Sequence, residues 1–304
     1  FFFSAVLDNL TTAIVMAALL GKIIKDRQQL LFFAGIMILS ANAGGAWSPI
    51  GDITTIMLWV GGQITLNIVQ AIIIPSLVCM IVPLVYVSFK YRGVVIERPA
   101  IKSEDKANEV IPYERNLLFI LGVLGLLFVP VFKTVTHLPP YLGMLLSLGV
   151  LWTVTEIIHR NKDKKQKHSL TVVGALSKIE ASTIFFFLGI LLAVGSLQST
   201  GILNSLANIL DDVFNGNLYI INIFIGFLSA ILDNVPLVAG AMGMYEIKAT
   251  GDFAVDGVFW EFLAYCAGTG GSLLVIGSAA GVAVMGILRI NFIWYIKNIS
   301  FLAL

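Results

Sequence analysis

Two nearly identical hexapeptides lie far apart in this chain, each within strongly apolar sequence. They are SAVLDN at Ser4–Asn9 and SAILDN at Ser229–Asn234, 225 residues further on. An aspartate at membrane depth is costly, so a fold that carries one in each half must surround both with protein or ions rather than lipid. Duplicated halves that meet near the middle of the membrane are typical of secondary transporters.

The composition is that of an all-α, polytopic membrane protein. Of 304 residues, 58% are hydrophobic and 12% are charged, and the mean hydropathy is +0.93, far above the range of soluble domains. The net charge of +1 argues against a nucleic-acid partner, which requires a basic face. Cys79 and Cys266 stand alone in apolar stretches, so we expect small core residues and no disulfide, metal centre or cofactor.

The sequence predicts membrane spans, two broken helices and two re-entrant hairpins. The broken helices are 28–60 and 257–287, because each is too long for one span of about 20 residues and has a Gly-rich interruption. The hairpins are 1–20 and 217–245, where Asp-Asn interrupts an apolar run and a non-helical tip requires protein or ions around it. The remaining candidate spans are 67–89, 116–132, 139–158, 179–198 and 291–304.

Basic residues are segregated as this topology requires. With each hairpin returning to its own side, 16 of the 19 Lys and Arg fall in loops on one face, and only Lys133 and Lys248 fall on the other. Since cytoplasmic loops carry the excess of Lys and Arg, the basic face is predicted to be cytoplasmic. The hairpins then enter from opposite sides, which predicts inverted repeats. Chance recurrence of the motif in two ordinary spans would not also predict this segregation.

The repeat divides the chain into three parts. Residues 1–89 are predicted to be the first repeat, 90–115 a charged cytoplasmic linker, and 116–304 the second repeat. At an offset of 226, Ala41–Gly45 pairs with Ala267–Gly271. Because the second motif follows a whole span whereas the first follows three residues, the first repeat is predicted to lack its N-terminal spans.

Three carboxylates, Asp8, Asp52 and Asp233, fall inside the predicted membrane zone, and Glu261 falls nearer one end. Each central carboxylate costs about 2.5 to 3.5 kcal/mol on insertion scales, and no buried Lys or Arg is expected beside it. A mobile cation or a proton is therefore the predicted partner. Hard cations prefer oxygen ligands, and glycines allow close backbone approach. Those glycines are Gly44, Gly45, Gly270 and Gly271, and the nearby neutral oxygens belong to Asn9, Asn42, Ser48, Thr54, Asn234, Thr269, Ser272 and Ser278.

These residues also have purely structural interpretations. Each aspartate could cap the half-helix that follows it by accepting hydrogen bonds from free amides. Glu261 could snorkel to the outer interface. The run Gly268–Ser272 has the glycines of a phosphate loop but no lysine, which disfavours nucleotide binding.

Two further segments are interpreted from their surroundings. Residues 199–214 are predicted to form an amphipathic connector on the outer face, with Leu203, Leu206, Ile209 and Leu210 on one side. The three histidines fall in loops or at span ends without ligand spacing, so we expect them to be solvated. They are His137, His159 and His168.

The stretch Asn42–Thr55, NAGGAWSPIGDITT, together with the two hexapeptides, closely resembles the NhaD-type sodium/proton antiporters of the ion transporter superfamily. The resemblance covers nearly the whole chain. It implies a scaffold domain, a moving transport domain built from the hairpins and broken helices, and a homodimer. In the more distant dicarboxylate relatives Ser-Asn-Thr stands where this chain has Asp-Asn, and the added negative charges favour a cation over an anion.

The predicted function is secondary active exchange of sodium, and of lithium as a second cation, for protons. Asp8 and Asp233 are predicted to bind the cation or a proton in competition, with Asp52 as a third carboxylate. Asn9, Asn42, Ser48, Asn234 and Thr269 are predicted to supply neutral oxygens. The chain is thus predicted to be a transporter and not an enzyme, surrounded by lipid in a bacterial inner membrane.

Two other functions stay open on the sequence alone. An anion permease of the same fold, of the dicarboxylate or arsenite type, would bind oxyanions at the N-termini of half-helices. An intramembrane aspartyl hydrolase would use the pair of aspartates. That chemistry requires the two on adjacent helices sharing a proton, whereas here each stands at a predicted hairpin tip beside an asparagine.

Overall fold

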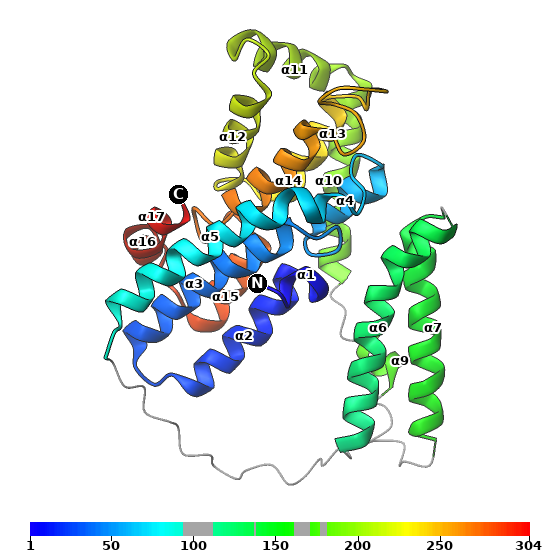
Figure 1. Ribbon diagram of the computed structural model, residues 1–304, viewed down its shortest axis with the longest axis vertical. Coiled ribbons are helices and arrows are strands. Elements are labelled where there is room, and N and C mark those ends of the chain that lie inside the picture. The colour runs from blue at the N-terminus through cyan, green and yellow to red at the C-terminus, as the bar shows by residue number, and fades with distance from the viewer. Residues whose placement is uncertain (94–111, 137, 161–170, 177–180) are drawn as a thin grey trace. The chain divides into compact units, whose positions relative to one another are not determined.

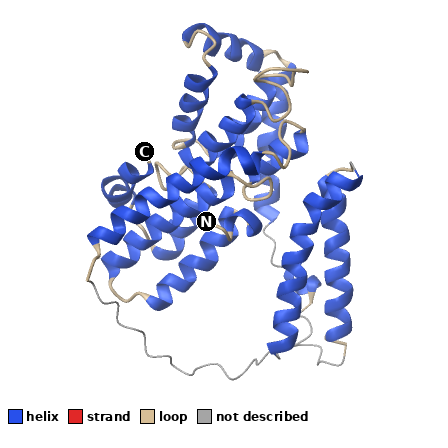
Figure 2. Ribbon diagram, viewed as in Figure 1, coloured by secondary structure: helices blue, strands red, loops and turns tan. Residues whose placement is uncertain are grey.

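The computed structural model describes residues 1–93, 112–136, 138–160, 171–176 and 181–304. Within these ranges the chain is helical and has no strand (Figure 2), which confirms the all-α prediction. It divides into two compact units, unit 1 with residues 1–100 and 190–304 and unit 2 with residues 101–189. Most of the predicted linker 90–115 lies outside the described residues.

Unit 1 contains both copies of the Asp-Asn motif (Figure 1). Its first part consists of α1 (Ser4–Leu7), α2 (Asn9–Ile23), α3 (Arg27–Ala46), α4 (Ile53–Gly61) and α5 (Ile68–Lys90). Its second part begins in α10 (Ala181–Ser199) and continues with α11 (Ile202–Val213), α12 (Leu218–Ser229), α13 (Asn234–Met244), α14 (Val258–Gly270) and α15 (Ala279–Leu288). The chain then forms α16 (Phe292–Tyr295), a π-helical turn (Ile296–Ser300) and α17 (Phe301–Ala303).

Both long apolar segments are interrupted as the sequence predicts. Helices α3 and α4 are separated by residues 47–52, and α14 and α15 by residues 271–278. Asp52 caps α4 at φ −145° and ψ 153°, and Ser278 caps α15 at φ −144° and ψ 148°. A small polar residue at the same offset in each half therefore restarts a helix with nearly the same backbone geometry.

The core of unit 1 lies where α2, α3, α15 and the C-terminal helices pack together. Ile38, Val284, Tyr295 and Ile299 are fully buried in it. Gly35 makes room for Ile299, because a Cβ atom on Gly35 would lie 2.5 Å from its side chain. This packing fixes the broken helices against each other.

Unit 2 is built around two long apolar helices, α6 (Pro112–Thr136) and α7 (Pro140–Ile158). The short helix α9 (Val172–Leu176) follows them. Ser147 Oγ donates to Gly125 O at 2.9 Å between α6 and α7. The expectation that His159 is solvated is wrong, because it is 1% exposed and its Nε2 lies 3.5 Å from Glu114 Oε2. His137 and His168 lie outside the described residues.

Four described helices are long and apolar enough to cross a membrane: Arg27–Ala46, Ile68–Lys90, Tyr113–Thr136 and Pro140–Ile158. Two bent pairs of helices bring the number to six if each is counted as one span. The segment Phe292–Ala303, which covers most of the predicted span 291–304, meets α15 at 117°. The large exposed hydrophobic side chains on α5, such as Ile74 and Phe89, fit a lipid-facing surface.

The connector predicted at 199–214 is the amphipathic helix α11, bent by 77° from the end of α10. The four residues of the predicted apolar side differ in exposure. Leu203 and Leu210 are buried, whereas Leu206 and Ile209 are 39% and 56% exposed. Helix α11 therefore packs one apolar stripe on α13 and leaves a second one exposed.

Candidate functional site

Asp52 is the centre of a buried polar cluster in unit 1, at 2% exposure. Its Oδ2 accepts hydrogen bonds from Asn9 Nδ2 at 2.8 Å and from Asn234 Nδ2 at 3.1 Å. Its Oδ1 accepts from Thr54 N at 3.2 Å, which caps α4. The asparagines of both repeated hexapeptides thus converge on one carboxylate oxygen.

Asn42 connects this cluster to the second broken helix. Its Oδ1 accepts from Asn9 Nδ2 at 3.2 Å, and its Nδ2 donates to the hydroxyl oxygens of Ser272 and Ser278, both at 2.9 Å. All four side chains are buried. A continuous network therefore joins both hexapeptides to the interruptions of both broken helices.

The aspartates of the two hexapeptides are arranged differently. Asp8 has φ 68°, and its carboxylate accepts from Thr11 N at 2.6 Å and from Thr11 Oγ1 at 3.0 Å, so it caps α2. Asp233 makes no capping bond, and its Oδ1 is buried without a hydrogen-bond partner. The sequence explains the difference, because Pro236 stands where the first copy has Thr11 and proline has no N–H to donate.

Each aspartate directly precedes an asparagine that bonds Asp52. Among the described residues, the buried polar set contains no Lys or Arg. Besides Asp233 Oδ1, the buried hydroxyls of Thr12 and Thr54 accept and donate no hydrogen bond in the described residues. Negative charge and unsatisfied oxygens in one apolar region form a suitable environment for a cation or proton.

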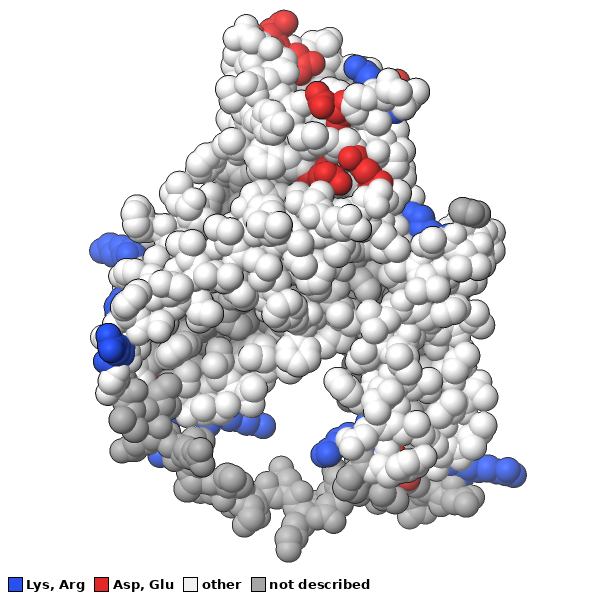
Figure 3. All heavy atoms as spheres, viewed as in Figure 1, with Lys and Arg blue, Asp and Glu red and all other residues white. Residues whose placement is uncertain are grey.

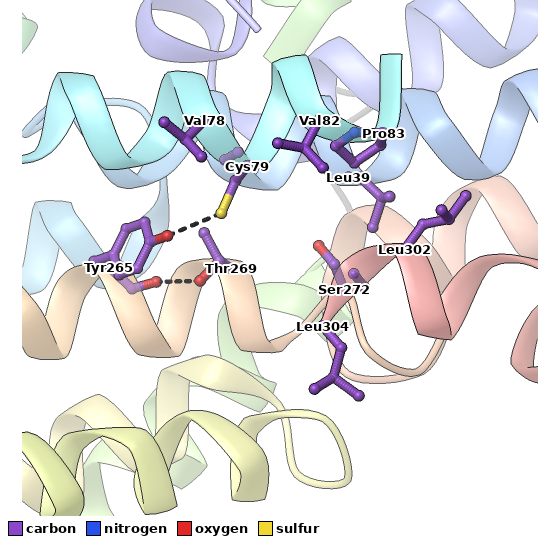
Figure 4. A pocket seen from close by; sticks show the side chains of 12 residues that line it. Leu39, Val78, Cys79, Val82, Pro83, Tyr265, Thr269, Ser272, Leu302 and Leu304 are labelled. Atoms are coloured by element: carbon purple, nitrogen blue, oxygen red, sulfur yellow. Dashed lines mark hydrogen bonds between the residues drawn. The ribbon is translucent and has the colours of Figure 1, made fainter. Parts of the chain in front are cut away.

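Two predicted ligands lie outside the network around Asp52. Ser48 Oγ donates to Ala5 O at 2.7 Å, joining the first interruption to α1. Thr269 Oγ1 donates to Tyr265 O within its own helix. Thr269 lines a cavity of about 270 Å³ with Cys79, Tyr265 and mainly apolar side chains (Figure 4). Cys79 Sγ and Tyr265 Oη lie 2.9 Å apart in that cavity.

The four predicted glycines allow backbone to approach backbone. A Cβ atom on Gly45 would lie 2.5 Å from Gly51 O, and one on Gly271 would lie 2.7 Å from Gly277 O. Gly44 and Gly270 leave no space for a Cβ beside the carbonyls of Phe1 and Gly226. These contacts occur at matched positions in the two halves.

Sequence reasoning missed the serines that begin the two hexapeptides. Ser4 Oγ donates to Ala41 O at 2.6 Å, and Ser229 Oγ donates to Ala267 O at 2.9 Å. Each connects its hexapeptide to the broken helix that follows it in the chain. The available signal was their identical position in the repeat. Tyr295, whose hydroxyl donates to Ser272 O at 2.9 Å, had no such signal.

Apolar helices, interrupted helices and a buried network of carboxylates and amides define a membrane transporter rather than an enzyme. Comparison with known families agrees with this class, since residues 1–264 match the family described as citrate transporter, CitMHS. The chain belongs to this transporter family.

Several relatives in the family are named as antiporters. Sodium/proton antiporter 1 of Arabidopsis thaliana is 47% identical over 99% of this chain, and the chain spans about half, 51%, of that relative. Sodium/proton antiporter 2 of the same plant is 44% identical, with 99% of this chain and 70% of the relative covered. The Na(+)/H(+) antiporter NhaD of Vibrio parahaemolyticus is 32% identical, with 95% and 72% covered. The resemblance to NhaD-type antiporters is thereby confirmed.

Proposed function

We propose that this chain forms the ion-binding part of an antiporter that exchanges sodium for protons across a membrane. The single observation that carries the proposal is the buried carboxylate of Asp52, held by Asn9 and Asn234 from the two hexapeptides. The names of the relatives support the choice of sodium and protons. Lithium, which resembles sodium in charge and ligand preference, is proposed as a second cation.

The proposed site has Asp52 at its centre and Asp233 as the second titrating group. Asp233 Oδ1 is free to accept a proton or a cation because it has no hydrogen-bond partner, whereas both oxygens of Asp8 already bond Thr11. Asn9, Asn42 and Asn234 position the carboxylate and supply amide oxygens. Sodium binding requires ionised carboxylates, so loading sodium releases protons and couples the two fluxes.

An anion substrate is the second candidate, because the family is described as citrate transporters. Three aspartates without a buried basic partner in the described residues work against that choice. Bringing an anion to such a site would add like charge in a medium of low dielectric constant, where repulsion is strong. We therefore propose the cation function for this member of the family.

We also propose that the two halves are inverted repeats with the basic loops in the cytoplasm. Matched contacts support the repeat: Ser4 to Ala41 O beside Ser229 to Ala267 O, and the caps at Asp52 and Ser278. Most of the acidic side chains visible in unit 1 gather at the end that carries α11 and α13 (Figure 3), which suits a face opposite the basic loops 21–28 and 288–290 of that unit. A homodimer in the lipid bilayer completes the proposal.

Competition kinetics test the exchange. The protein is reconstituted in sealed vesicles, and initial rates of sodium-dependent proton movement are measured with a pH-sensitive dye at several pH values and a fixed pH gradient. Because sodium and protons share the carboxylates, acid should raise the apparent KM for sodium about tenfold per pH unit below the titration midpoint, with a nearly constant maximal rate. An apparent KM independent of pH over two units around neutrality would contradict shared carboxylates, and citrate-dependent uptake would favour the anion function.

A further inference from the structure

Asp256 fastens the loop before α14 to the loop between α4 and α5. Its Oδ1 accepts from Thr65 N at 2.5 Å, and its Oδ2 accepts from Thr65 Oγ1 at 2.5 Å and from Asn67 Nδ2 at 3.0 Å. Its own N–H donates to Gln63 O at 2.9 Å. Four hydrogen bonds, three of them to an ionised group, make this a strong connection between residues about 190 positions apart.

The backbone at Asp256 is held in an uncommon conformation to make these bonds. Its φ is 58°, in the left-handed region, where a residue other than glycine persists only if its surroundings require it. Gly257 follows, and a Cβ atom there would collide with Asp252 O. The chain thus accepts local strain at this position, which is better explained by a constraint on Asp256 than by a free loop.

The loop that carries Asp256 is itself anchored. Trp260 Nε1 donates to Phe253 O at 3.1 Å, and the rings of Phe253 and Tyr245 lie 4.7 Å from that of Phe259. Phe259 and Trp260 are fully buried in the first turn of α14. The loop that carries Asp256 is therefore held against the start of α14, so the bonds of Asp256 restrict the positions of Thr65 and Asn67.

Its partners follow directly after α4, the helix that Asp52 caps. Helix α4 has nine residues, so its two ends are only about 13 Å apart. Gly62 ends it in a left-handed conformation at φ 86°, and Gln63 and Thr65 come next. A displacement of this end tilts a short helix and moves the Asp52 carboxylate relative to Asn9 and Asn234.

We infer that Asp256 is a positioning residue for the ion site: its bonds to Thr65, Asn67 and Gln63 fix the far end of α4 and so keep Asp52 in register with both asparagines. The inference rests on the proposed function. The connection stays closed throughout exchange, because its support in α14 and its target after α4 both belong to the helices that hold the site.

Three substitutions separate positioning from charge. Asp256→Ala removes all three side-chain bonds and is expected to raise the apparent KM for sodium about tenfold, corresponding to about 1.4 kcal/mol of binding free energy, with the maximal rate changed less than about twofold. Asp256→Asn retains an oxygen for Thr65 N and is expected to restore most of the affinity. Asp252→Ala is the control, because it removes the same charge from the same loop. The Asp252 side chain is exposed and does not hold the end of α4, so the apparent KM for sodium is expected to match that of the wild type.

Hydrogen exchange of the α4 amides, followed by mass spectrometry, gives a readout that does not depend on transport. Amide hydrogen exchange in Ile53–Gly61 should accelerate in the Asp256→Ala protein and stay unchanged in the Asp252→Ala protein. Unchanged α4 exchange in a folded Asp256→Ala protein overturns the inference even if wild-type transport is confirmed. Equal rises of KM in Asp252→Ala and Asp256→Asn also overturn it, because they would indicate a charge effect.

A disulfide tests whether the connection stays closed. Thr65→Cys combined with Asp256→Cys, in a background without Cys79 and Cys266, replaces the hydrogen bonds by a covalent link. Under oxidising conditions the linked protein is expected to exchange sodium for protons at a rate within about twofold of the reduced protein. Loss of exchange on oxidation and its return on reduction would mean that the connection opens in each cycle, and would overturn the inference.

Discussion

At the residue scale, identical motifs are given different roles by one neighbouring residue. Thr11 provides the amide and hydroxyl that Asp8 accepts as a cap. Pro236, at the equivalent position, provides neither, so Asp233 keeps a buried oxygen without a partner. In the proposed site, capping and ion binding compete for the same lone pairs, and the second hexapeptide is the one that leaves them available.

Asp233→Asn should abolish sodium/proton exchange and leave the protein folded. The amide keeps the shape of the carboxylate and one oxygen, but it cannot titrate. The measurement is sodium-dependent dye response in vesicles, with elution from size-exclusion chromatography as the control for folding. Exchange at the wild-type rate would reduce Asp233 to a structural residue.

Pro236→Thr should weaken sodium binding, because it gives the second motif the threonine that the first motif has as Thr11. A threonine at this position offers Asp233 an amide and a hydroxyl, and the capped carboxylate must give up those bonds to bind a cation. At about 1 kcal/mol for a helix cap, the apparent KM for sodium is expected to rise roughly fivefold. Pro236→Ala, which restores the amide only, should give a smaller rise, and equal affinities in all three proteins would contradict competition between capping and binding.

At the element scale, glycines decide how closely the two arms of an interrupted helix approach. Gly45 lies in the last turn of α3, and Gly51 lies two residues before α4 begins. Their backbones approach so closely that neither position leaves space for a Cβ atom. Asp52 is brought back toward Asn42 by this close approach, so the geometry of the network depends on two positions that have no side chain.

Gly45→Ala should destabilise the protein although alanine is the better helix former. The added Cβ would lie 2.5 Å from Gly51 O, and such overpacking costs on the order of 2 kcal/mol. Gly149→Ala in α7 is the matched control, because a Cβ there meets nothing within 4 Å and should stabilise by up to about 1 kcal/mol. Thermal unfolding in detergent compares the two, and a Gly45→Ala midpoint at or above that of Gly149→Ala would contradict the close-approach explanation.

At the scale of the whole molecule, local chemistry was easier to predict than long-range geometry. The interruptions at 47–52 and 271–278 follow from runs of Gly, Ser and Pro, which weaken a helix wherever it packs. That both asparagines would meet at Asp52, rather than each at its own aspartate, depends on how two halves dock, and no pattern within one half encodes it. The expected solvation of His159 was wrong for the same reason, because its burial depends on a neighbouring helix.

The arrangement of the halves across the membrane gives the last prediction, which tests the proposed inverted repeat. Cysteines at Lys25, between α2 and α3, and at Thr250, between α13 and α14, are both exposed positions in unit 1. In a background without Cys79 and Cys266, an impermeant maleimide added outside intact cells should label only the cysteine at position 250. Position 25 lies among Lys22, Lys25 and Arg27, so the positive-inside rule puts it in the cytoplasm, reached only after permeabilisation. Labelling of both positions from outside would leave the starts of the two broken helices on one face, and the inverted repeat would have to be abandoned.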